Sequence, residues 1–150
     1  MEYLYIPLIY GIDPNQFLRD MKAVGDLDHI TGDYSQDTFN LCGDASVWLA
    51  NKLITKEKDI FITVGDFKHL DHWTDHLWVE WDEFIIDLTL AQFISNSPKI
   101  AVVEKTNKLY KKIKRYTPLE FLDKAGIKKI SKKRKVYKLM MCNIMERSEI

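Results

Sequence analysis

The chain is poor in the residues that cross-link small folds or anchor them in membranes. It has 150 residues and only two cysteines, Cys42 and Cys142, a hundred positions apart. Such a pair is no disulfide framework, which favours the cytosol, or delivery to a host or target cell without a signal peptide, over an oxidising compartment. No apolar run approaches the roughly 20 residues that span a bilayer. The opening MEYLYIPLIYG lacks a basic segment, so we expect no signal peptide and no membrane association.

Signs of modular organisation are also missing. The sequence has no internal repeat, no low-complexity tract and no recognisable domain boundary. Apolar residues make up 46% of the chain and charged residues 29%, which is ordinary for a globular protein and wrong for a disordered one. We therefore expect one domain over residues 1–150, with a sizeable core.

Positive charge is scarce in the first part of the chain and concentrated afterwards. Residues 1–98 contain 6 Lys and Arg against 17 Asp and Glu, whereas residues 99–138 contain 15 against 3. The lysine-rich segment 105–138 can be a solvated face, a docking surface for an acidic partner or a contact with nucleic acid. No zinc-finger spacing or RNA-recognition aromatic motif accompanies the lysines, so nucleic acid is the least favoured of the three.

Periodicity and turn signals predict an α+β fold, with helices first and a mainly antiparallel sheet after them. A helix is expected over residues 13–25, with Asp13 as N-cap, and another over 117–126, with a Thr117–Glu120 capping box and Gly126 at its end. A third helix carries Cys42 and is capped by Asn40. Strands are expected at residues 3–10, 59–66, 76–81, 84–89, 99–105 and 135–145, the last burying Cys142, and loops at 26–40 and 67–75.

The segment HLWVEWDEFIIDLT, residues 76–89, predicts a hairpin with a tight Asp82-Glu83 turn. In that register Trp81 pairs with Phe84. Side chains alternate across a strand, so one face carries only apolar residues and must be the core side. The opposite face carries His76, Trp78, Glu80, Ile85, Asp87 and Thr89. His76 and Asp87 are diagonal neighbours there, within reach of a hydrogen bond.

This placement suggests chemistry at Cys42. The N-terminus of a helix carries partial positive charge and favours a thiolate. An aspartate beside an imidazole fixes its tautomer, and an imidazole so held can accept a thiol proton. Each residue alone has an ordinary explanation, as a core thiol, a structural histidine or a turn aspartate. Together they favour Cys42 as nucleophile, His76 as base and Asp87 as orienting group.

These residues carry a family resemblance. NLCGDASVWLANKL, followed by HLWVEWDEFIIDLTLAQF, resembles the transglutaminase-like branch of the papain-like cysteine enzymes, over residues 36–93. That family has a cysteine at a helix start, His-x-Trp on one strand and an aspartate on the next, which match Cys42, His76 with Trp78, and Asp87. The resemblance implies a papain-like or transglutaminase-like core and an acyl-enzyme intermediate formed from an amide, without a cofactor. It leaves open whether water, an amine or another thiol takes the acyl group.

Further residues of the predicted site can be named. The Cys42 amide would be one oxyanion donor. Gln36 lies six residues before Cys42, as in papain-like peptidases, and is either the second donor or a solvated loop glutamine, with Asn40 as substitute. We expect Trp78 to form a cleft wall, His72 to touch substrate and Glu80 to be exposed. Histidines and aspartates in HLDHWTDH match no standard zinc spacing, so we expect no metal site.

Two functions remain open. The first is a thiol hydrolase or acyltransferase acting on a protein, peptide or other amide. The alternative is a non-catalytic binding protein that retains the fold and offers its basic C-terminal surface to an acidic partner. Thiol reactivity at Cys42 separates the two.

Overall fold

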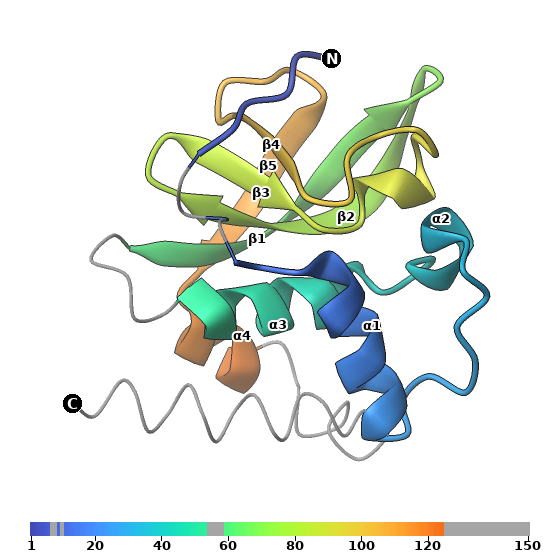
Figure 1. Cartoon of the computed structure of the whole chain (residues 1–150). Helices are drawn as coiled ribbons and strands as arrows, with labels where there is room; N and C mark the ends of the chain where they lie inside the picture. Colours follow the sequence, from blue (N-terminus) through green and yellow to red (C-terminus); the bar gives the residue numbers. More distant parts are fainter. Residues whose placement is uncertain (7–8, 10, 54–58, 125–150) are drawn as a thin grey trace.

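The computed structural model describes residues 1–6, 9, 11–53 and 59–124. Within these ranges, helices cover one face of a five-stranded antiparallel sheet with strand order β4-β3-β2-β1-β5 (Figure 1). The α+β class and the antiparallel sheet are therefore confirmed. The strand expected at residues 135–145, with Cys142, and the helix end at Gly126 lie outside the described residues.

The helices begin where the capping signals predict. The Asp13 side chain accepts the Asn15 N–H at 2.9 Å at the start of α1 (Pro14–Ala23). Thr117 and Glu120 form the capping box of α4 (Pro118–Lys124), with two reciprocal bonds of 3.2 Å. Both predictions are confirmed. The remaining helical elements are α2 (Tyr34–Asp37), α3 (Cys42–Leu53) and the 3-10 helix η2 (Leu90–Gln92). Helix α2 lies inside the expected loop 26–40, because four residues are too few for helical periodicity to show.

The strands are β1 (Ile60–His69), β2 (His72–Trp81), β3 (Phe84–Asp87), β4 (Ala101–Glu104) and β5 (Tyr110–Tyr116). Trp81 pairs with Phe84, so the predicted register of the β2–β3 hairpin is confirmed. The expected loop at 67–75 is wrong. Leu70 and Asp71 both have positive φ, 47° and 65°, as a two-residue type I′ turn requires, and they join β1 directly to β2.

Two further strand predictions need correction. None of the described residues within 3–10 belongs to a strand; there, the Leu4 N–H makes a single backbone bond of 2.7 Å to the Val102 carbonyl of β4. Strand β5 went unpredicted because its sequence, YKKIKRY, is rich in lysine and has four consecutive exposed residues. Its pairing with β1 is what makes it a strand.

Both faces of the sheet are buried, by two separate groups of side chains. The larger core lies between the sheet and the helices and includes Phe17, Trp48, Leu49, Val79 and Ile86. A smaller core covers part of the opposite face and includes Phe67, Trp78, Ile85, Leu90, Val103 and Tyr110. The hairpin face that carries His76 and Asp87 is therefore interior as well.

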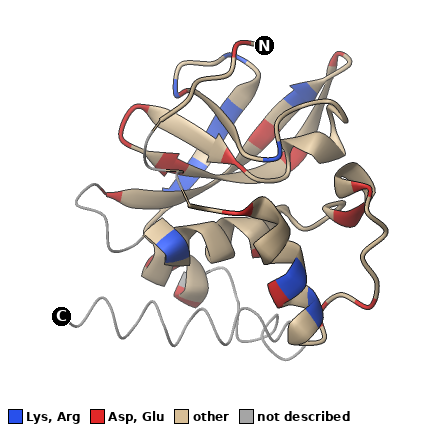
Figure 2. Cartoon of the chain, viewed as in Figure 1, with Lys and Arg blue, Asp and Glu red and all other residues tan. Residues whose placement is uncertain are grey.

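Glu80 on this second face is 2% exposed, so the expectation that it is solvated is wrong. Its carboxylate lies 2.9 Å from Arg115 Nη2 on β5 and 3.5 Å from Lys105 Nζ. A buried carboxylate needs such partners because losing them leaves its charge uncompensated. The lysines of β5 point elsewhere: residues 111, 112 and 114 are exposed, and Figure 2 shows this positive charge along the strand.

We expect Gly65→Ala to lower the free energy of unfolding by about 3 kcal/mol. Gly65 lies where the β1–β5 register shifts, and a Cβ there would overlap the Lys111 carbonyl and the Trp78 ring. Urea denaturation measures the loss. Gly32→Ala is the control, since nothing lies within 4 Å of its added Cβ and only its positive φ of 91° disfavours alanine. We expect this variant to lower the free energy of unfolding by about 1 kcal/mol. Equal losses would contradict the packing role of Gly65.

Candidate active site

Cys42 is the first residue of α3, so its predicted place at a helix N-terminus is confirmed. The Ala45 N–H donates to the Leu41 carbonyl at 2.8 Å, which makes Leu41 the N-cap residue. The prediction that Asn40 caps this helix is therefore wrong; Asn40 lies one residue earlier, with φ of 60°. Within the described ranges the Cys42 N–H has no hydrogen-bond acceptor, so a free donor lies beside a half-buried thiol.

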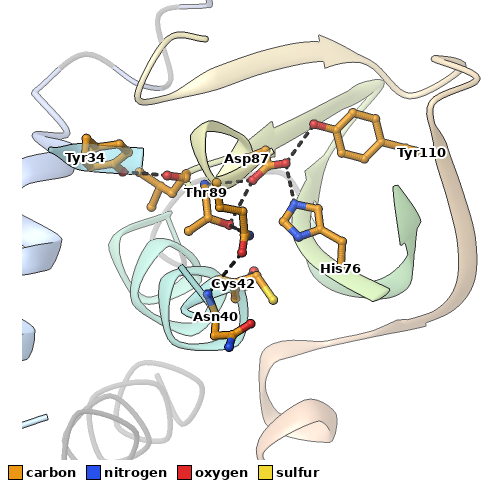
Figure 3. A network of polar contacts seen from close by, with 10 residues as sticks. Tyr34, Asn40, Cys42, His76, Asp87, Thr89 and Tyr110 are labelled. Atoms are coloured by element: carbon orange, nitrogen blue, oxygen red, sulfur yellow. Dashed lines mark hydrogen bonds and ion pairs between the residues drawn. The ribbon is translucent and has the colours of Figure 1, made fainter. Parts of the chain in front are cut away.

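His76 and Asp87 meet across the β2–β3 hairpin as its register predicts. His76 Nε2 lies 2.7 Å from Asp87 Oδ2 (Figure 3), and the two side chains are 0% and 1% exposed. Phe67 and Phe93 pack their rings edge-on against the imidazole, with centroids 6.1 and 5.0 Å away. The hydrogen bond is thus shielded from water, where it is stronger than at a surface.

The third member of the set, Cys42, interacts with the His76 ring. His76 Nδ1 is buried and has no partner of hydrogen-bond geometry among the described residues. The Cys42 side chain nevertheless acts on the ring through hydrogen bonding and charge. Figure 3 shows Cys42 at the start of α3, in the same region as His76 and Asp87. The two facts agree if the sulfur lies near the ring without a hydrogen bond of standard geometry to Nδ1.

The surroundings of His76 favour its protonated form. Burial is the largest single influence and lowers the pKa of His76. The charge and hydrogen bond of Asp87, together with the Cys42 side chain, raise the pKa by more than burial lowers it, to about 9. The ring therefore carries its proton at pH 7. An imidazolium and the N-terminus of α3 both attract negative charge, which is the environment that a nucleophilic cysteine needs.

Asp87 has two more partners that the sequence did not single out in this role. Its Oδ1 accepts the Thr89 N–H at 2.9 Å, with the Thr89 hydroxyl at 3.4 Å. Its Oδ2 accepts the Tyr110 hydroxyl of β5 at 2.8 Å. Thr89 follows Asp87 within the motif DLT, whereas nothing in the sequence around Tyr110 marks it as a site residue. These bonds give the buried carboxylate the hydrogen-bond partners that it needs in the interior.

Gln92 of η2 connects this carboxylate to the start of α3. Its Nε2 donates to the Thr89 hydroxyl at 3.2 Å, and its Oε1 accepts the Asn40 N–H at 3.2 Å. Asn40 lies two residues before Cys42. Hydrogen bonds therefore run from Asp87 to the segment before Cys42 without passing through His76 (Figure 3).

Gln36, the expected oxyanion donor, is exposed on α2. It lines a surface hollow of about 480 Å³ with residues of the loops on either side of α2, among them Phe39, Asn40 and Leu41. That hollow reaches the residue before Cys42, but neither Cys42 nor His76 lines it. The oxyanion role of Gln36 stays a prediction.

The two expected substrate contacts, Trp78 and His72, lie in different environments. Trp78 is 1% exposed and packs beside His76 and Tyr110, with ring centroids 5.9 and 5.0 Å away, so it supports the imidazole from the core instead of forming an open cleft wall. His72 is exposed at the start of β2, opposite His69. Its contact with substrate stays a prediction.

Comparisons with known proteins identify no relative: no family model, no curated protein and no solved structure matches this chain. The part of the chain that the structure describes holds no group of three or more His, Cys, Asp or Glu side chains that could bind a metal ion. None of its helices is long and apolar enough to cross a membrane.

The raised pKa of His76 predicts a pH-dependent stability. Folding favours the protonated ring, so its contribution is complete below pH 6.5 and disappears as the pH rises through about 9. We expect the free energy of unfolding to fall by on the order of 2 kcal/mol over that interval. Urea denaturation at a series of pH values measures it.

The matched variant is Asp87→Asn, which keeps the shape of the side chain and removes its charge. It should be less stable than the parent at pH 7 and lose most of the decline between pH 6.5 and 9. A parent protein with constant stability across this interval would contradict the assigned protonation state.

Proposed function

We propose that this protein is a thiol-dependent hydrolase or acyltransferase that attacks an amide, with Cys42 as nucleophile, His76 as acid and base, and Asp87 as orienting group. The observation that supports it best is the buried 2.7 Å contact between His76 and Asp87 beside the first residue of α3. Because Asp87 occupies one ring nitrogen, only Nδ1 remains for proton transfer, and Cys42 is the site residue that would exchange a proton there.

The reaction follows from these positions. The Cys42 thiolate attacks the carbonyl carbon, and the new S–C bond places negative charge on the carbonyl oxygen, where the free Cys42 N–H can donate. The His76 proton passes to the leaving amine as the C–N bond breaks. Water or an acceptor amine then gives a proton to neutral His76 and attacks the acyl group. The C–S bond breaks and the thiolate returns.

The finer fold that we propose is a transglutaminase-like core, in which α3 supplies the cysteine and two paired strands supply the histidine and aspartate. Of the three residues only Cys42 is accessible, so the substrate carbonyl must come to the sulfur. A peptide or protein segment suits this approach, since all the reacting groups come from the chain and no cofactor is needed. A free thiol at the site fits the cytosol.

A second candidate is a binding protein that retains this fold without catalysis. The observation in its favour is β5, where Lys111, Lys112 and Lys114 are exposed and Ile113 is 65% exposed. Lysines around an exposed apolar side chain suit an acidic protein partner. The experiment below decides between the two candidates.

We expect Cys42→Ala to abolish activity, with a loss of at least about 10³-fold, because the nucleophile has no substitute. Casein serves as the test substrate in three assays: release of free amines, release of ammonia, and incorporation of dansylcadaverine. The three report peptide hydrolysis, glutamine deamidation and acyl transfer to an amine. Iodoacetamide labelling with mass spectrometry tests the thiol directly, and at pH 7 Cys42 should react faster than N-acetylcysteine.

The matched control is Cys142→Ala, which removes the other thiol of the chain and should leave all three assays unchanged. A fully active Cys42→Ala protein would contradict the proposal. Iodoacetamide labelling of Cys42 no faster than that of N-acetylcysteine would favour the binding protein.

A further inference from the structure

The Asp87 carboxylate accepts hydrogen bonds from two side chains at the same oxygen. His76 Nε2 lies 2.7 Å and the Tyr110 hydroxyl 2.8 Å from Oδ2, while Thr89 occupies Oδ1. We propose that Tyr110 is a positioning residue of the active site, whose hydroxyl holds the Asp87 carboxylate in place and shares Oδ2 with the His76 ring. This inference rests on the proposed function, and it adds β5 to the elements that build the site.

Tyr110 is itself held rigidly. Its ring packs edge-on against Phe67 and Trp78, with both centroids 5.0 Å away, and the side chain is 7% exposed. Its backbone pairs with Phe67 of β1 in the sheet. The hydroxyl therefore has little freedom to leave Asp87, and any rotation of the carboxylate away from His76 would break this bond too.

The hydroxyl is a permanent donor. Burial raises the pKa of Tyr110 well above its ordinary value, and the charge of Asp87 together with the hydrogen bond to it raises the pKa further. A phenol that never ionises in the working pH range always offers its proton to Oδ2. By drawing charge from that oxygen, it moderates the attraction between Asp87 and the His76 proton.

This moderation matters because His76 must both keep and release its proton. If Asp87 bound the imidazolium too strongly, the ring would protonate the leaving amine slowly, because a general acid works best when its pKa lies near the ambient pH. The titratable groups that interact with the cluster are Cys42 from α3, Asp87 from β3, and three tyrosines whose pKa the charge of Asp87 raises, Tyr3, Tyr34 and Tyr110. Of these three tyrosines, Tyr110 is the one with a hydrogen bond to the carboxylate.

The test is Tyr110→Phe, followed by an NMR titration of the imidazole resonances of the four histidines. Without the competing donor, Asp87 holds the His76 proton more tightly. We expect the His76 midpoint to rise by about 0.5 to 1 pH unit, while the other three histidines keep theirs. An unchanged or lowered His76 midpoint would overturn the proposal.

Tyr34→Phe is the matched control. Tyr34 is also 7% exposed, and its hydroxyl donates to the Leu88 carbonyl at 2.6 Å, next to Asp87 but not to its carboxylate. This variant removes an equally buried phenol hydroxyl and should leave the His76 midpoint where it is. Equal shifts in the two variants would show that any lost buried hydroxyl has this effect, and would also overturn the proposal.

A second measurement covers the case in which Tyr110→Phe does not fold. Incorporation of 3-fluorotyrosine at position 110 keeps the ring and hydroxyl but makes the phenol a stronger donor, so the His76 midpoint should fall below that of the parent. No change would refute the role of Tyr110. Iodoacetamide labelling of Cys42 in the parent is run alongside: slow labelling there refutes the proposed function, whereas fast labelling with an unmoved midpoint refutes only the role of Tyr110.

Discussion

The hydrogen bond between His76 Nε2 and Asp87 Oδ2 is the interaction on which the rest of the site depends. It joins an imidazole and a carboxylate that are both almost completely buried. A buried carboxylate without partners would be costly, so each remaining acceptor position of Asp87 is occupied, by the Thr89 backbone and hydroxyl and by Tyr110. The smaller core cluster packs around this pair, and its aromatic rings exclude water from the hydrogen bond.

Burial on both faces of the sheet gives this pair its chemical character. In a sheet covered on one side only, His76 and Asp87 would face solvent, which would weaken their attraction. Here the second cluster closes over them and leaves Cys42 as the accessible member of the three. The charge of Asp87 therefore acts at close range on the two groups that share its Oδ2, the His76 ring and the Tyr110 hydroxyl. Gln92 and Thr89 add a second, separate connection between Asp87 and the loop before Cys42.

Strand β5 shows how one segment can serve both surface and interior. Its lysines at 111, 112 and 114 are exposed and account for much of the basic character of residues 99–124. The side chains of Tyr110 and Arg115, near its two ends, reach the interior. Tyr110 donates a hydrogen bond to Asp87, and Arg115 forms an ion pair with Glu80. Composition alone suggests a solvated face or a docking surface, and that interpretation misses the two residues that contact buried carboxylates. Pairing with β1 aligns them with their partners.

The amino-acid sequence by itself determined the start of α1, the capping box of α4, the position of Cys42 at a helix start and the register that brings His76 to Asp87. Those features depend on signals within a few residues of one another: caps, a two-residue turn and the alternation of side chains along a hairpin. Only the tertiary structure decided that β5 joins the sheet, that Glu80 is buried and that Tyr110 completes the Asp87 site. These contacts join residues far apart in the chain, and their partners are selected by packing, which no local pattern encodes.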